Sequence, residues 1–177
     1  RETTIRYDQC RLGLFIMNTS LITRIALVSV VGVLAAPTSV AQTSVFALID
    51  AVREDRSGDV TRLLQAGVSV HAVQPDGGTA LHWAVHRNNV EIASRLLAAG
   101  AAADAANELG VRPIALACTN GNTGMVRMLL VHGAGADAAL PTGVTPLMTC
   151  ARSGNSEAAL HLLEYGADVN AREAVRG

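Results

Sequence analysis

Two histidines, His82 and His86, lie four residues apart in the stretch GTALHWAVHRNN, and Trp83 directly follows the first of them. On a helix, residues i and i+4 share a face, and two imidazoles on one face can supply half of a zinc site. The stretch lacks the glutamate of the HExxH metalloprotease motif, and Glu91 falls in what we expect to be the next helix. We therefore favour a structural His82 beside a surface His86 over a metal site.

Other residues with catalytic potential form no recognisable motif. The glycines do not follow either phosphate-binding pattern, GxGxxG or GxxxxGK[ST]. The carboxylates are scattered along the chain, so no pair of them indicates acid–base catalysis. We expect no catalytic residue, no cofactor and no bound metal.

The composition narrows the class of partner. The 177 residues carry a net charge of −1, so the chain has no overall field that would attract nucleic acid or an anionic membrane. Aromatic residues make up 3% of the chain, which leaves few platforms on which bases could stack. The apolar half of the sequence is mostly Ala, Val and Leu, which suits short helices packed closely. We expect no nucleic-acid partner.

The N-terminal part follows a different pattern. After Arg24 comes an apolar run of twelve residues, IALVSVVGVLAA at 25–36, then Pro37 and the small residues SVA at 39–41. This order is typical of a secretory signal peptide, and the run is shorter than the ~20 residues of a membrane span. We expect residues 17–41 to be a signal peptide cleaved after Ala41, giving a periplasmic or secreted protein that is no longer membrane-bound. Residues 1–16 precede Met17, and we expect them to be an upstream extension without a function.

A period of 33 residues organises the rest of the chain. Leu-Leu pairs at 63–64, 96–97, 129–130 and 162–163 keep this interval, as do Gly67, Gly100, Gly133 and Gly166. Such a period is typical of repeats that bury their apolar faces only by stacking on one another. We place the repeats at about 44–76, 77–109, 110–142 and 143–175, in a domain that covers 42–173.

Each repeat predicts two short helices and a turn. Thr79 and Thr145 can cap the first helix, and Pro113 and Pro146 follow the cap, where a missing N–H costs nothing. The turn into the second helix falls at Asn88, Gly121 and Gly154. The glycine after each Leu-Leu pair fits a helix end with positive φ.

The repeat resembles the ankyrin repeat. GTALHWA (78–84), GVTPLM (143–148), LLAAGA (96–101) and LLEYGADVNA (162–171) carry the resemblance, which covers about residues 45–173. It implies an all-α solenoid of stacked helix-turn-helix units with β-turn or hairpin loops, and a non-enzymatic scaffold that binds another protein. It also implies that His82 makes hydrogen bonds that tie neighbouring loops together.

The resemblance implies a concave binding surface made of loop tips and first-helix faces. The loop-tip positions are Asp76, Gly78, Glu108, Leu109, Val111, Pro141, Thr142 and Val144. The helix-face positions are His86, Arg87, Thr119, Asn120, Arg152 and Ser153. Trp83 aligns with Leu116 and Thr149, and we expect it to pack into the core, the alternative being a partly exposed binding residue.

Cys118 and Cys150 occupy non-equivalent positions in the first helices of adjacent repeats. Packed helices lie ~8–10 Å apart, whereas a disulfide needs Cα atoms within about 7 Å. We therefore expect two buried free thiols that act as small hydrophobic residues.

The sequence at the start of the repeat array predicts a capping unit, whereas the sequence at its end does not. The charged stretch REDRSGD in the first repeat is typical of a capping unit, whereas ADVNAREAVRG at the other end has the form of a linker. We expect either that residues 174–177 begin a further unit or a tail, or that the fourth repeat leaves its outer face exposed. The protein is expected to be a monomer.

Two other functions remain open. The chain can be the N-terminal interaction or targeting part of a longer enzyme or receptor. It can also handle a metal or heme through His82, His86 and His132.

Overall fold

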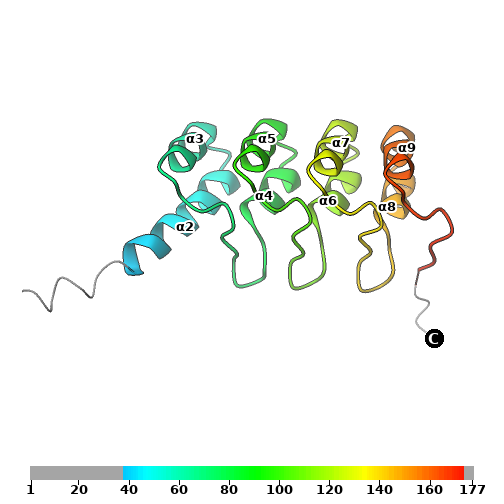
Figure 1. Cartoon of the computed structure of the whole chain (residues 1–177), viewed down its shortest axis with the longest axis horizontal. Helices are drawn as coiled ribbons and strands as arrows, with labels where there is room; N and C mark the ends of the chain where they lie inside the picture. Colours follow the sequence, from blue (N-terminus) through cyan, green and yellow to red (C-terminus); the bar gives the residue numbers. More distant parts are fainter. Residues whose placement is uncertain (1–37, 174–177) are drawn as a thin grey trace, which may run out of the picture. The chain divides into compact units, whose positions relative to one another are not determined.

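The computed structural model describes residues 38–173, which form eight α-helices (Figure 1). The chain divides into two units, Arg1–Ala41 and Gln42–Gly177, and the repeats belong to the second. Residues 1–16, 174–177 and most of the expected signal peptide lie outside the described range. Only residues 38–41 of that peptide are described, as the start of the first helix.

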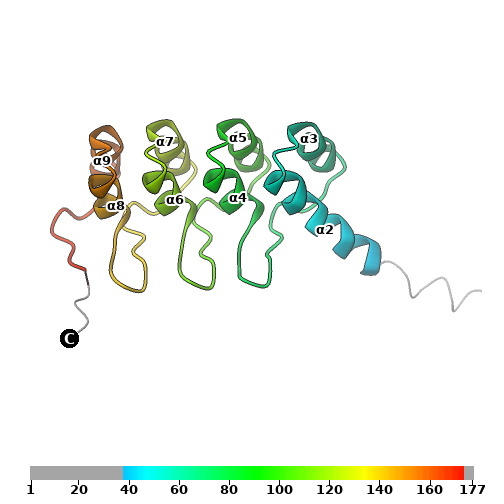
Figure 2. The ribbon, with the colours of Figure 1, turned by 180° about the vertical axis from the view of Figure 1, so that it is seen from behind.

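The helices pair within each repeat. The pairs are α2 (Thr38–Arg53) with α3 (Ser57–Gln65), α4 (Ala80–His86) with α5 (Val90–Ala98), α6 (Pro113–Thr119) with α7 (Thr123–Val131), and α8 (Pro146–Arg152) with α9 (Ser156–Glu164). Figures 1 and 2 show the pairs side by side in a row, with a long loop leading from each pair to the next. We call these loops the first finger (66–79), the second finger (99–112) and the third finger (132–145). The expected all-α stack of helix-turn-helix units is confirmed.

The predicted start signals of the first helices are confirmed. The hydroxyl oxygen of Thr79 accepts a hydrogen bond from the backbone N–H of His82, and Thr145 does the same for Met148. Pro113 and Pro146 take up the first helical position, where their missing N–H leaves no bond unmade.

The second helices have caps that the sequence analysis missed. The side-chain oxygens of Asn89, Asn122 and Asn155 each accept from the backbone N–H three residues on. The residue before each of these caps has positive φ: Asn88 at +56°, Gly121 at +68° and Gly154 at +75°. Asparagine and glycine are the residues that tolerate this conformation, so this turn recurs in the three repeats.

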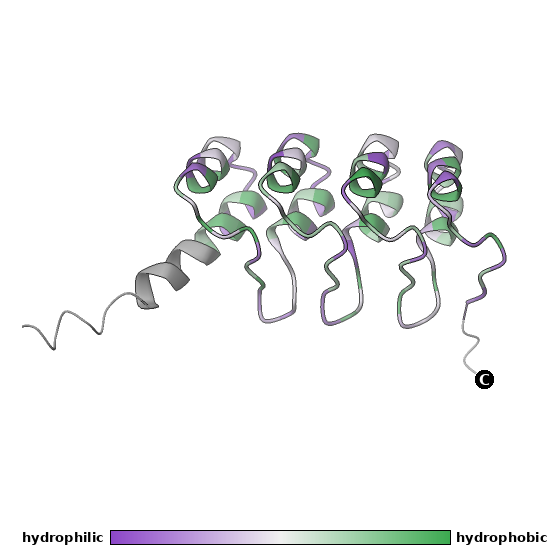
Figure 3. Cartoon of the chain, in the orientation of Figure 1, coloured by the Kyte–Doolittle hydropathy of each residue, from purple (hydrophilic) through white to green (hydrophobic). Residues whose placement is uncertain are grey.

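The core runs continuously through the stack, and Figure 3 shows apolar residues on both rows of helices. Leu96, Leu129 and Leu162, the first member of each later Leu-Leu pair, are fully buried. The second members differ, because Leu97 and Leu130 are 4% and 3% exposed whereas Leu163 is 40% exposed. The outer face of the fourth repeat is therefore open among the described residues, and the two expectations for this end both stay open.

Cys118 in α6 and Cys150 in α8 form a disulfide bond, so the expectation of free thiols is wrong. Their Cα atoms are 4.6 Å apart, and neither residue is exposed. The distance of ~8–10 Å between packed helices separates their axes and not their Cα atoms. Each Cα lies about 2.3 Å from its axis, so two Cα atoms on facing sides are about 4.6 Å closer than the axes. The one-residue offset between the two positions places both cysteines in this contact.

Candidate functional site

Neighbouring fingers are in direct contact near their tips. The backbone N–H of Glu108 in the second finger donates to the carbonyl of Asp76 in the first, at 2.9 Å. Gly77 permits this approach, because it has φ of +76° and a Cβ atom there would lie 2.9 Å from the nitrogen of Glu108. Between the next two fingers, a Cβ at Gly110 would lie 2.6 Å from Cδ of Pro141. The fingertips therefore form one continuous edge.

His82 ties the first helix of its repeat to the second finger, as expected. Its Nε2 lies 3.0 Å from the carbonyl oxygen of Val111, and its Nδ1 lies 2.9 Å from the hydroxyl of Thr79. A carbonyl oxygen only accepts, so the proton sits on Nε2. Burial lowers the pKa of His82, and the Val111 carbonyl and the charge of Asp76 oppose this effect. Both ring nitrogens have partners, so neither is free to bind a metal.

A groove lies between the fingers and the first helices of the second and third repeats. It has a volume of about 250 Å³ and is lined by Asp76, Gly78, His82, Trp83, His86, Asn107, Val111 and Leu116. We call it the Trp83 groove. It joins the first finger, the second finger, α4 and α6, so a ligand in it would contact two repeats at once.

Trp83 forms the aromatic wall of the groove and is held in place on several sides. Its ring packs partly against the core, and its Nε1 donates to the side-chain oxygen of Gln74 at 2.7 Å. The His86 ring stands edge-on to it at 6.0 Å between centroids, and the guanidinium of Arg53 lies 6.0 Å from its centroid. Trp83 thus both packs against the core and lines the groove.

The groove carries negative charge on its finger side. The finger side carries the carboxylates of Asp76 and, beside it, Glu108. Two exposed arginines near Trp83, Arg53 and Arg87, do not line the groove. Arg53 pairs with Asp50 at 2.9 Å, and the Arg87 guanidinium donates to the Arg53 carbonyl at 2.6 Å. A partner side chain in the groove would therefore face the acidic finger side.

The structure brings only some of the expected binding residues together. Asp76, Gly78, His86 and Val111 line the Trp83 groove. Exposed positions along the fingers and first helices are Glu108, Leu109, Pro141, Thr142, Thr119 and Arg152. Leu109 is 74% exposed, whereas Val144 is 8% exposed and offers little surface.

Several of the expected binding residues also make contacts within the chain. The side-chain N–H of Asn120 donates to the carbonyl of Val85 at 2.7 Å, and Ser153 donates to the carbonyl of Cys150 at 2.9 Å. Arg87 reaches the preceding repeat in the same way. These residues support the surface as well as belonging to it.

Asn107 and Leu116 are groove residues that the sequence analysis missed, as it missed Gln74, which holds Trp83 in place. Leu116 stands 33 residues after Trp83, so the repeat register could have indicated it. Asn107 shapes the second fingertip, where its side-chain oxygen accepts from the N–H groups of Leu109 and Val111. No feature of the sequence pairs Gln74 with Trp83.

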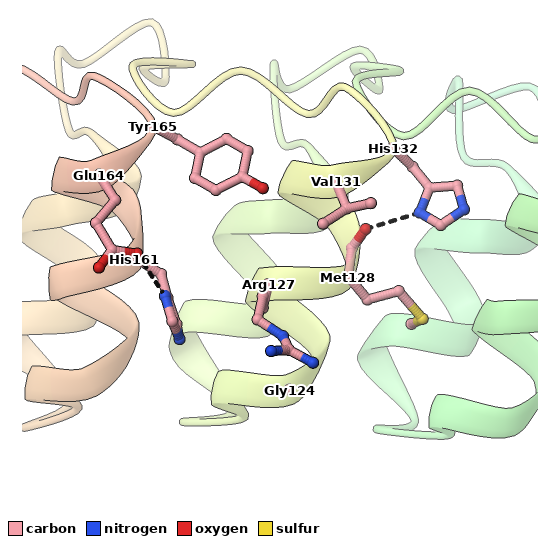
Figure 4. A pocket seen from close by; sticks show the side chains of 8 residues that line it. All are labelled: Gly124, Arg127, Met128, Val131, His132, His161, Glu164 and Tyr165. Carbon is pink, nitrogen blue, oxygen red and sulfur yellow. Dashed lines mark hydrogen bonds and ion pairs between the residues drawn. The ribbon is translucent and has the colours of Figure 1, made fainter.

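A second concavity of about 610 Å³ lies on the outer helices, between α7 and α9 (Figure 4). The Nδ1 atom of His132 lies 2.9 Å from the carbonyl of Met128, and that of His161 lies 3.0 Å from the Glu164 carboxylate. Figure 4 shows the His132 ring pointing away from α9, which carries His161. Within the described part of the chain, no three side chains of His, Cys, Asp or Glu gather as a metal site would require.

Comparison with known families gives one result. The family model described as ankyrin repeats (3 copies) matches residues 48–138 and residues 95–173. The sequence has no match among curated proteins. Of the helices described, none is both long and apolar enough to span a bilayer.

Proposed function

Because the chain belongs to the ankyrin-repeat family, whose members typically bind other proteins and are generally not enzymes, we propose that it is a non-enzymatic scaffold with a protein partner. The Trp83 groove is the observation that supports a particular binding surface. Acting as a monomer, the protein would hold its partner between the fingers and the first helices, with no role for nucleic acid.

The chemistry of the groove suits a protein side chain. Tryptophan and arginine are enriched among residues that dominate binding energy, and such residues lie in pockets near the centre of an interface. Trp83 is already fixed by Gln74 and by the core, so little side-chain entropy would be lost when a partner binds. We expect the partner to insert an apolar side chain beside Trp83, with basic neighbours that face the acidic finger side of the groove.

We further propose that the protein is exported to the periplasm or secreted after cleavage behind Ala41. The apolar run at 25–36 and the small residues at 39–41 support this proposal. The Cys118–Cys150 disulfide adds support, because disulfides persist in oxidising compartments and are rare in the cytosol.

Affinity capture from a periplasmic or secreted extract tests the binding proposal. His86→Asp combined with Leu109→Asp places charges on two exposed residues near the groove, and Val131→Asp on the outer face is the matched control. We expect the partner to be captured by the original chain and by the control but not by the double variant. Loss of capture only in Val131→Asp would instead place binding on the outer helices.

Export is tested separately by N-terminal sequencing of the protein recovered outside the cytoplasm. We expect the sequence to begin at Gln42. Recovery of the whole chain in the cytoplasm with an intact N-terminus would refute export, while leaving the binding proposal in place.

A further inference from the structure

We infer that the Cys118–Cys150 disulfide holds the fourth repeat onto the stack and fixes the binding surface that spans repeats three and four. The first half of this inference concerns the fold alone. The second half rests on the proposed function.

The fourth repeat is packed on one side only among the described residues. Val169 is 71% exposed, whereas its equivalent in the third repeat, Ala136, is 8% exposed. Ala151 is exposed as well, whereas the equivalent Cys118 is fully buried. In a stack, each repeat gains most of its stability from its neighbours. Among the described residues the fourth repeat, like the first, has a neighbour on one side only, and local opening is expected to begin in such end repeats.

The polar link between the turns of repeats three and four is also weaker than its equivalents. The side-chain N–H of Asn89 donates to Asp55, and that of Asn122 donates to the Asn88 side chain at 2.6 Å. The same group of Asn155 is buried and finds no acceptor among the described residues, because the equivalent position holds Gly121. The hydroxyl of Thr123 still donates to the Asn155 oxygen at 3.0 Å.

The loop tie made by His82 has no counterpart at this junction. The equivalent residue in the third repeat is Ala115, which has no polar side chain to reach the next finger. Asp137 provides one remaining link, since its carboxylate accepts from the backbone N–H of Asp168 at 2.7 Å. Against this background, a covalent bond between α6 and α8 is the strongest connection across the junction.

The disulfide is placed where it can position the candidate binding surface. Thr119 and Asn120 directly follow Cys118, and Arg152 and Ser153 lie within three residues of Cys150. The bond fixes the distance between α6 and α8 and so the spacing of these two groups. A shift of α8 would carry Arg152 and Ser153 away from the surface of the third repeat.

The chemistry of the bond makes this connection reversible. Oxidation joins the two sulfurs and releases two protons and two electrons, which a disulfide of the thioredoxin-like oxidoreductase class would accept and so become a dithiol. In the reverse reaction, an external thiolate attacks one sulfur, forms a mixed disulfide and releases the other cysteine. A second external thiolate then attacks the external sulfur of the mixed disulfide, which releases the remaining cysteine and leaves the two external sulfurs joined as a disulfide; each released cysteine takes up a proton. Both residues are 0% exposed, so either exchange needs the fourth repeat to open first.

Native-state hydrogen exchange on the purified chain tests the inference in three forms: oxidised, reduced with a small dithiol, and as the variant Cys118→Val with Cys150→Ala. The variant introduces the residues found at the equivalent positions of the second repeat, Val85 and Ala84. We expect the amides of α9 to exchange about a hundredfold faster in the reduced protein and in the variant than in the oxidised protein. Exchange in α4 and α5 should stay the same.

Two outcomes would overturn the inference. One is α9 exchange that is equal in the oxidised and reduced protein; the other is a reductant effect on α9 that persists in the variant without the two cysteines. If the variant fails to fold, the comparison of oxidised with reduced original chain decides alone. None of these readouts needs a partner, so a failure of the proposed binding function would leave them unchanged.

Discussion

The unpaired amide of Asn155 offers a substitution that should stabilise the protein. In the two preceding junctions, the residue with positive φ before the cap provides the acceptor: Asp55 for Asn89 and Asn88 for Asn122. Gly121 holds the equivalent position with φ of +68°, and a Cβ atom there would have no neighbour within 4 Å. Gly121→Asn should therefore adopt the conformation of Asn88, which has φ of +56°, and accept from Asn155.

The size of the effect follows from two terms. Pairing a buried donor that has no acceptor is worth about 1–2 kcal/mol. Replacing glycine restricts the unfolded chain by about 0.4–1 kcal/mol, and the cost of positive φ for asparagine offsets much of this gain. We expect Gly121→Asn to stabilise the fold by about 1–2 kcal/mol, which raises Tm by roughly 4–8 °C for a domain of this size.

Gly154→Asn is the matched control. Gly154 has φ of +75° and the same open surroundings, but the described residues hold no further repeat whose cap could donate to it. The assay is urea unfolding followed by circular dichroism at 222 nm, and Gly154→Asn should change the free energy of unfolding by less than about 0.5 kcal/mol. Equal effects of the two substitutions, or a loss of stability in Gly121→Asn alone, would contradict the expected hydrogen bond from the Asn155 amide to position 121.

Three further predictions concern the disulfide, the fingertips and His82. The disulfide closes a loop with a sequence separation of 32. Cys118→Val with Cys150→Ala should therefore lower the free energy of unfolding in urea by about 3–4 kcal/mol under oxidising conditions. If the variant is less stable than the original chain by the same amount under reducing conditions, the effect comes from packing and not from the bond. Gly77→Ala should lower the stability of the fold by about 2–3 kcal/mol in thermal unfolding, because it adds a clash with Glu108 to the strain of positive φ. Gly67→Ala, with φ of +77° and nothing within 4 Å, should lower it by about 1 kcal/mol. Similar losses in the two variants would show that the fingers do not touch. Folding lowers the pKa of His82 below its ordinary value of 6.5, so the neutral ring contributes its full stabilisation at pH values well above 6.5, and this contribution is lost as the pH falls below that value. His82→Gln should flatten that part of the stability profile, and a profile that keeps its slope in His82→Gln would contradict the assignment.

The sequence was sufficient to predict the architecture because the repeat imposes the same local chemistry several times. Thr79, Pro113 and the glycines after the Leu-Leu pairs act through the backbone of their own turn, so their roles follow from residue type and spacing. The role of His82 followed from the resemblance to the family and agrees with its contacts to Thr79 and Val111.

The features that the sequence did not reveal depend on distances between repeats. The Cys118–Cys150 bond requires knowing which sides of α6 and α8 face each other, and an average distance between helix axes does not contain that information. The hydrogen bond from Trp83 to Gln74 joins a helix to a finger, and the repeat pattern does not assign a partner to either position. Burial of Val144 similarly follows from how the third finger folds back, which the loop-tip position alone does not determine.

Site-specific photocrosslinking tests the central claim most directly, namely that this ankyrin stack binds a protein partner at the Trp83 groove. A photoreactive phenylalanine derivative such as p-benzoylphenylalanine would replace His86 in the groove and, as the control, Leu160, which is 60% exposed on α9. After illumination in a periplasmic or secreted extract, we predict a discrete crosslinked protein from position 86 and none from position 160. A crosslink from position 160 without one from position 86 would contradict the claim.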